Sequence, residues 1–250
     1  DAGKTTVYLP NGIWVVEGRL ILRGSVQRFI GCEAEFEGNG SMEIADGESG
    51  TVVFERFMKG YGSNFKIKIN NSRTTILSSC ILGHVDSIGS GDVFIDDICG
   101  DSFRFSNQKV WARQWNSEPP VTKITNDGGT VWILGLKTER EGTLIHTLNG
   151  GKTELLGGFC YATSHEKIEP MFVSVDSDVC YVIGESSFND WPFMILVRET
   201  RGKETKELKK GNAPGRTGGS MIPLFTGYSN SEKETRLDSS SSDNPKSFSL

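Results

Sequence analysis

The chain alternates short strand-like runs with single asparagine or aspartate residues that recur at a similar spacing. Runs rich in β-branched and aromatic residues flank Asn107, Asn126, Asn149 and Asp176, and hardly any window shows the period of a helix. The steps between these residues are 19, 23 and 27 residues. A period in the low twenties is typical of one coil of a parallel β-solenoid, whose corners suit residues that tolerate the left-handed backbone region. We therefore predict an all-β chain folded as a single-stranded parallel β-helix.

A β-sandwich or barrel is the main alternative, because its strands also recur every 8 to 12 residues or so. The corners here separate pairs of strands and do not read as Asn-Gly or Asp-Gly hairpins, which favours the solenoid. The strand pattern predicts the β-helix over residues 1–198. A charge-rich stretch predicts a C-terminal cap or extension over residues 199–228, whose lysines would block end-to-end pairing. Residues 229–250 are rich in serine and charged residues and predict a flexible low-complexity tail.

Charge balance and the length of the apolar runs argue against two classes of partner. The chain has 27 lysines and arginines against 32 aspartates and glutamates, a net charge of -5, and no basic stripe. This pattern argues against a nucleic-acid footprint. No apolar run approaches the roughly 20 residues that a membrane-spanning helix needs. We therefore expect neither a nucleic acid nor a membrane as a partner.

Cysteine and histidine spacings give no support for a metal site. The chain has five cysteines without a Cys-x-x-Cys pair and three histidines without a metal-binding spacing. We expect no bound metal and no cofactor. The steps from Cys80 to Cys99 and from Cys160 to Cys180 are close to one coil, so we expect these residues to stack between adjacent coils. Free thiols are the preferred reading over a disulfide between coils.

The densest cluster of functional side chains lies in the segment 109–120. On a strand of period two, Trp111, Arg113 and Trp115 share one side while Val110 and Ala112 take the other. If the small apolar side faces the interior, the outer side carries two indoles around a guanidinium. Such a surface stacks sugar rings and bonds hydroxyls or a carboxylate. The alternative is that the tryptophans pack under a loop that covers the solenoid.

Two glutamates at strand ends are the candidate catalytic residues. Glu139 follows a strand that contains Trp132, and it has cations beside it that can set its ionisation. Glu185 comes two coils later, on a strand that could bring it to the same side. Glycoside hydrolysis needs two carboxyl groups about 5 to 9.5 Å apart, which is the separation expected of residues one or two coils apart. A charged strand end is also typical of a solvated turn. We assign Glu118, with the tryptophans and Arg113, to substrate binding.

An acidic cluster offers a different chemistry. Four aspartates on a β-helix face could hold calcium for a polysaccharide lyase, with Arg113 as base or clamp. The sequence has no Asp-x-Asp-x-Asp-Gly loop, and solvated corners are the simpler explanation. The four residues are Asp92, Asp96, Asp97 and Asp101.

Several segments together resemble a known family. They are Val110-Trp-Ala-Arg-Gln-Trp-Asn116, Asn126-Asp-Gly-Gly-Thr-Val-Trp-Ile-Leu-Gly-Leu-Lys-Thr-Glu139, Gly184-Glu-Ser-Ser-Phe188 and Leu196-Val-Arg-Glu-Thr-Arg201. They resemble the C-terminal part of bacterial pectate-lyase-superfamily proteins related to glycoside hydrolase family 55. The resemblance covers roughly Thr6 to Arg201 and implies a right-handed, pectin-lyase-like parallel β-helix. Family 55 implies inverting, exo-acting hydrolysis of β-1,3-glucan with a glutamate as general acid, at a site between two β-helices.

The sequence thus predicts a carbohydrate-active protein, secreted or at the cell surface, with a polysaccharide as partner. The leading hypothesis is a glycoside hydrolase of a β-glucan or related polysaccharide, with Glu139 as general acid and Glu185 positioning water. A non-catalytic polysaccharide-binding or structural β-helix is the first alternative, and a calcium-dependent lyase is the second. A preceding N-terminal β-helix domain outside this chain is a further candidate partner.

Overall fold

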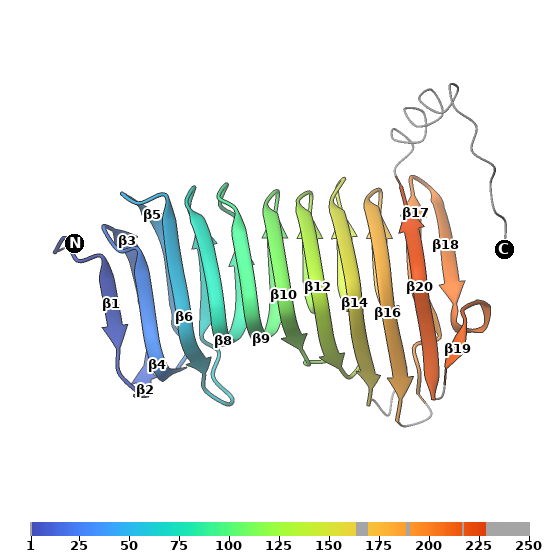
Figure 1. Ribbon diagram of the computed structural model, residues 1–250, viewed down its shortest axis with the longest axis horizontal. Helices are drawn as coiled ribbons and strands as arrows, with labels where there is room; N and C mark the ends of the chain where they lie inside the picture. Colours follow the sequence, from blue (N-terminus) through green and yellow to red (C-terminus); the bar gives the residue numbers. More distant parts are fainter. Residues whose placement is uncertain (1, 164–169, 189–190, 217, 229–250) are drawn as a thin grey trace, which may run out of the picture.

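The computed structural model describes residues 2–163, 170–188, 191–216 and 218–228. The chain winds into a β-solenoid of about 8 turns, with β1 at one end and β18 and β20 at the other (Figure 1). The prediction of an all-β parallel β-helix is therefore confirmed. The predicted tail, residues 229–250, lies outside the described part. Within the described ranges, no helix is long and apolar enough to cross a membrane.

Each full coil has three faces, and neighbouring coils pair as parallel strands in register. The long strands bend from the first face onto the second, and β8 and β9 continue onto the third. The elements are β1 (Thr6–Leu9), β2 (Gly12–Val15), β3 (Arg19–Gly24), β4 (Arg28–Glu37), β5 (Ser41–Gly47), β6 (Thr51–Lys59), β7 (Lys66–Asn70), β8 (Thr74–Ser87), β9 (Val93–Ser106), β10 (Lys109–Ser117), β11 (Ile124–Asp127), β12 (Thr130–Glu139), β13 (Ile145–Leu148), β14 (Lys152–Ala162), β15 (Phe172–Val175), β16 (Asp178–Ser187), β17 (Ile195–Arg201), β18 (Glu204–Lys209), the 3-10 turn η1 (Lys210–Asn212), β19 (Gly215–Arg216) and β20 (Gly219–Gly227).

The corner between the first and second faces is a single residue in the left-handed backbone region. Five consecutive coils place a non-glycine residue there, with φ between 50° and 59°, and the next two coils place a glycine there. The left-handed residue turns the chain without ending the strand pairing on either side. Successive corners are 17 to 23 residues apart. They are Glu33, Arg56, Ser79, Asp97, Gln114, Gly135 and Gly157.

The corner between the third and first faces uses the asparagines and aspartate that the sequence singled out. Asn107, Asn149 and Asp176 have φ values of 55°, 56° and 45°, as predicted for left-handed corners. Asn126 differs, because its side chain is buried and replaces missing backbone bonds. Its Nδ2 donates to the Lys152 carbonyl at 2.9 Å, and its Oδ1 accepts from the Gly129 amide at 3.0 Å. The Asn126 side chain thus satisfies backbone groups that the corner removes from the sheet.

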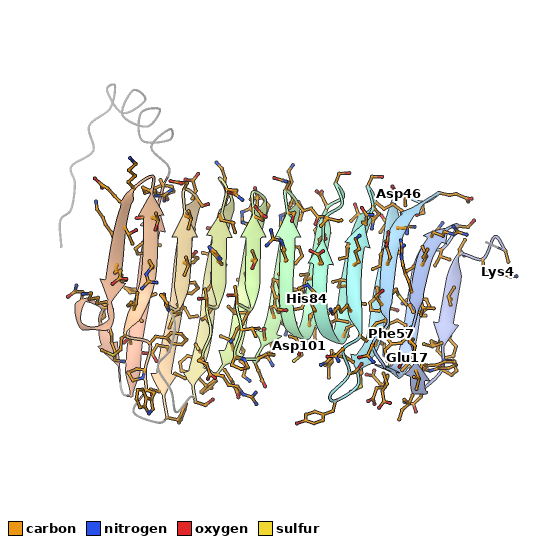
Figure 2. The ribbon with its side chains drawn as sticks, turned by 180° about the vertical axis from the view of Figure 1, so that it is seen from behind. Lys4, Glu17, Asp46, Phe57, His84 and Asp101 are labelled. Atoms are coloured by element: carbon orange, nitrogen blue, oxygen red, sulfur yellow. The ribbon has the colours of Figure 1, made fainter. Side chains whose placement is uncertain are left out.

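The interior is filled by inward side chains that stack from coil to coil. In the N-terminal half Phe29, Phe54 and Phe57 stack with centroid distances of 4.5 to 5.8 Å, and Phe57 lies inside the solenoid (Figure 2). Cys80 and Cys160 are also buried, and all five cysteines are free. Cys99 pairs in register with Ile81 and not with Cys80, and Cys180 pairs with Glu154 and not with Cys160, so both expected cysteine stacks are wrong.

Two antiparallel strands close the C-terminal end. The last parallel strand, β17, pairs with β15 and ends at Arg201. The charge-rich stretch continues as β18, which pairs antiparallel with β17, and β20 pairs antiparallel with β16. Under these strands the inward residues Tyr181, Ile183 and Val197 are buried. The end of the interior is therefore covered by residues of the chain itself.

Candidate functional site

Three aromatic rings stack on the outside of the first face and form what we call the aromatic ladder. Phe94, Trp111 and Trp132 occupy the same register position on β9, β10 and β12. The Trp111 ring lies 4.9 Å from Phe94 at an interplanar angle of 11°, and 5.1 Å from Trp132 at 17°. Parallel strands place in-register side chains on the same side at a spacing of about 4.8 Å, which matches ring stacking.

The aromatic ladder forms the floor of an open hollow of about 510 Å³. On the next outward register position Leu134 and Leu156 are exposed, which extends the apolar surface toward β14. On β14 the register partner of Trp132 is Glu154. The aromatic ladder therefore ends at Trp132, with a carboxylate on its far side. The hollow is therefore mainly apolar, with polar groups at its margin.

An ion pair lies at the margin of the hollow. The Arg113 Nε and the second guanidinium nitrogen donate to the two carboxylate oxygens of Asp96 at 2.6 and 2.9 Å. These hydrogen bonds lower the pKa of Asp96 and raise the pKa of Arg113. The pair is largely exposed, so its geometry presents a fixed, charged edge to a ligand more than it stabilises the fold.

The structure corrects the predicted placement of Trp115. Trp111 and Arg113 lie on the outside, but Trp115 is 1% exposed and packs inside against Phe103. The reason is the left-handed corner at Gln114, which interrupts the alternation of sides along the strand. Trp115 therefore cannot contact a ligand on the outer surface, and the prediction that it shares a side with Trp111 is wrong.

Glu139 and Glu118 meet on the outside of the second face, around Lys137. The Lys137 Nζ donates to a carboxylate oxygen of Glu139 at 2.6 Å and also to Glu118. The bond from Lys137 and a second from Asn116 lower the pKa of Glu118. The Lys137 ammonium also lies 6.0 Å from the centre of the Tyr161 ring. This Lys137 cluster is a compact, internally paired group away from the aromatic ladder, since the two lie on different faces.

Glu185 lies inside the solenoid. It is 1% exposed, and one of its oxygens accepts a hydrogen bond from Lys210 of η1 at 3.0 Å. Its register partner on β14 is the buried Cys160, whereas the register partner of Glu139 is Tyr161. The two glutamates therefore point to opposite sides of the sheet, and the prediction that they flank one glycosidic bond is wrong.

The four aspartates of the acidic cluster do not converge. Asp96 binds Arg113, Asp97 is the corner residue, and Asp101 pairs with Lys59 at 2.9 Å. Among the residues that the structure describes, no three histidine, cysteine, aspartate or glutamate side chains come together where they could hold a metal ion. The described residues therefore provide no set of calcium ligands for the polysaccharide-lyase alternative.

The sequence pointed to Trp111, Trp132 and Arg113 but missed the residues that complete the hollow. They include Ile76, Phe94, Leu134, Glu154 and Leu156. Phe94 precedes Trp111 by 17 residues and Trp132 follows it by 21, so the coil period was the signal that could have found the stack. Leu134 and Leu156 directly precede the corner glycines Gly135 and Gly157. Only the pairing of β12 with β14 shows that the two leucines lie side by side.

Comparison of the chain with protein-family models, with curated proteins and with solved structures finds no match. The parallel β-helix is shown by the structure, and the resemblance to the pectate-lyase superfamily and to family 55 stays a prediction.

Proposed function

We propose that the protein binds a polysaccharide along its first face without cleaving it. The observation that carries this proposal is the aromatic ladder in an open hollow with the Asp96–Arg113 pair at its margin. Sugars present apolar C–H faces and hydroxyl edges, which fit an aromatic surface beside charged hydrogen-bonding groups. The aromatic ladder repeats over three successive coils, which suits a polymer segment that lies along the solenoid axis.

The rings differ in what they offer to a sugar. Both faces of Trp111 are occupied by neighbouring rings, so only its edge is free. Trp132 has one face stacked on Trp111, and Glu154 occupies the register position beside its other face. We therefore assign the apolar contact with a sugar to the outward edges of Trp111 and Trp132, and hydrogen bonds to sugar hydroxyls to Arg113 and Glu154.

Hydrolysis is the weaker proposal. A glycosidase needs its two carboxyl groups on either side of the bond that it cleaves, and Glu139 and Glu185 lie on opposite sides of the sheet. Glu118 is also held by Lys137 in the form that accepts, and not donates, a proton.

We propose that the protein meets its glycan outside the cell or at the cell surface, since structural polysaccharides such as β-glucans are found there.

The experiment is a binding assay on a polysaccharide panel that includes laminarin, by affinity electrophoresis and calorimetry. We expect Trp132→Ala to weaken binding about two- to tenfold, since one aromatic contact contributes roughly 0.5–1.5 kcal/mol. Trp191→Ala is the matched control, because Trp191 is an exposed tryptophan that does not line the hollow.

Two results would contradict the proposal. One is that no polysaccharide on the panel binds; the other is that the two tryptophan variants lose affinity equally. Release of reducing sugar by the wild type that is lost in Glu139→Gln would favour a glycoside hydrolase over a protein that binds without cleaving.

A further inference from the structure

A second hollow, of about 260 Å³, adjoins the hollow above the aromatic ladder. Trp132 of β12 and Glu154 of β14 line both hollows, and these two strands lie side by side (Figure 1). The second hollow extends over the start of β16, where Asp178 and Cys180 line it. The surface open to a polymer therefore continues past the last aromatic ring, and Glu154 lies where its two parts join.

The Glu154 carboxylate has no partner within the part of the chain that the structure describes. Its side chain is half-buried and makes neither a hydrogen bond nor an ion pair with any of those residues. Burial and, after it, the negative charge of Glu154 raise the pKa of the neighbouring Cys180 thiol. An ionised carboxylate only accepts hydrogen bonds. Glu154 therefore offers its full capacity for hydrogen bonds, and its charge, to a ligand.

The other charged residues that line the two hollows are paired with one another. Asp96 accepts two hydrogen bonds from Arg113, at 2.6 and 2.9 Å. The Lys152 ammonium lies 3.5 Å from an Asp178 carboxylate oxygen. With Glu154, these four are the charged residues lining the hollows in the described ranges. The combined surface thus carries one unpaired charge, and that charge is negative.

This charge pattern discriminates among classes of glycan. An acidic sugar would find the carboxylate-binding edge of Arg113 occupied by Asp96 and would be repelled by Glu154. A neutral sugar offers Glu154 only hydroxyl groups. An amino sugar offers an ammonium group with three donors, and hydrogen bonds between ionised partners are roughly twice as strong as neutral ones. The amino sugar therefore matches this surface best.

We propose that the glycan is a polymer of amino sugars with free ammonium groups, of the glucosamine type, and that Glu154 binds the ammonium. This assignment rests on the proposed function. Trp132 and Glu154 are in register on adjacent strands, about 4.8 Å apart along the solenoid axis. One sugar residue can therefore place its C–H groups against the outward edge of Trp132 while its amino group contacts the carboxylate.

The test compares two hexasaccharides that differ only in charge, one of glucosamine and one of N-acetylglucosamine. Affinities are measured by calorimetry at low salt and about pH 6, where amines are protonated and carboxylates ionised. We expect the glucosamine form to bind about three- to tenfold more tightly, because Glu154 is only half-buried and water weakens the ion pair. Added salt should reduce this preference.

Glu154→Gln keeps the shape of the side chain and removes its charge. It should abolish the preference and leave the affinity for the N-acetylated form unchanged, whereas Trp132→Ala should weaken binding of both forms. Glu204→Gln is the matched control, because Glu204 is an exposed glutamate of β18 that lines neither hollow. This control should keep the preference, which excludes a general attraction of a polycation to a chain of net charge -5.

The outcomes separate this inference from the function on which it rests. If the N-acetylated form or a neutral glucan hexasaccharide binds as tightly as the glucosamine form, the inference is overturned and polysaccharide binding stands. A preference that persists in Glu154→Gln, or that Glu204→Gln loses equally, overturns it in the same way. If neither these hexasaccharides nor any polysaccharide of the panel binds, the proposed function fails and the inference fails with it.

Discussion

Replacing Trp115 with alanine should lower the free energy of unfolding by about 3 kcal/mol. Burying an aromatic side chain removes roughly 150–250 Å² from water, which at about 25 cal/mol per Å² stabilises the fold by roughly 4–6 kcal/mol. The Trp115 indole N–H has no hydrogen-bond partner among the described residues, and this opposes the gain by roughly 1–3 kcal/mol. The net value agrees with the roughly 3–5 kcal/mol typical of large-to-small changes at buried aromatic positions.

The assay is urea unfolding followed by far-ultraviolet circular dichroism, with the slope compared between variants to confirm that the same unit unfolds. Trp115→Phe is the control: it keeps most of the apolar contact with Phe103 and removes the unpaired N–H, so we expect a loss of about 1 kcal/mol or less. Trp111→Ala should cost about 1–2 kcal/mol, because that ring is only partly buried. The inward placement of Trp115 is refuted if Trp115→Ala costs no more than Trp111→Ala.

Three further predictions follow from the corners and the buried groups. Gln114→Gly should raise stability by about 0.5–1 kcal/mol, and Gly135→Ala should lower it by about 1–2 kcal/mol, because both positions have a positive φ; thermal midpoints that move in the reverse directions would count against this. Burial raises the pKa values of Cys80 and Cys160 to about 12, so a thiol reagent at pH 8 should modify these two cysteines only after denaturant is added, and rapid reaction in the native state would contradict their burial. Burial lowers the pKa of Lys123 to about 8, against about 10.4 in an unfolded chain. The folded state thus holds fewer protons between these values, and the stability of the wild type relative to Lys123→Met should rise by about 1–3 kcal/mol from pH 8 to 10 and not stay flat.

The coil period was predictable because the corner between the third and first faces has a recognisable residue preference. Asn107, Asn149 and Asp176 are residue types that tolerate a left-handed backbone, and they separate runs that read as strands. The same period places Phe94 and Trp132 one coil on either side of Trp111, so the aromatic ladder was within reach of the sequence. The fold class therefore follows from local preferences repeated along the chain.

Which side chains of the second face point inward could not be predicted in the same way. The corner before it is occupied by a glutamate, an arginine, a serine, an aspartate and a glutamine in successive coils, which share no chemistry and lie inside what reads as one strand. Counting by twos through such a corner gives the wrong side, as it does for Trp115. The pairing of β14 with β16 shifts register between Leu156 and Phe159, where β14 carries the corner residue Gly157 and β16 has no counterpart. Alternation along β16 with the buried Tyr181 and Ile183 places Glu185 inside, so its direction relative to Glu139 depends on which coils contain a corner residue.

The left-handed corner also makes the faces independent of one another. Because inward and outward positions are counted afresh after each corner, an odd or even number of residues on the first face has no bearing on which side chains of the second face enter the core. Coils of 17 to 23 residues can therefore share one continuous interior. A residue gained or lost next to a corner would be absorbed there, where in an ordinary sheet it would turn the rest of the strand inside out. The outer surface of the first face, aromatic ladder included, is thus free to change by substitution and by length while the second and third faces keep their sequences.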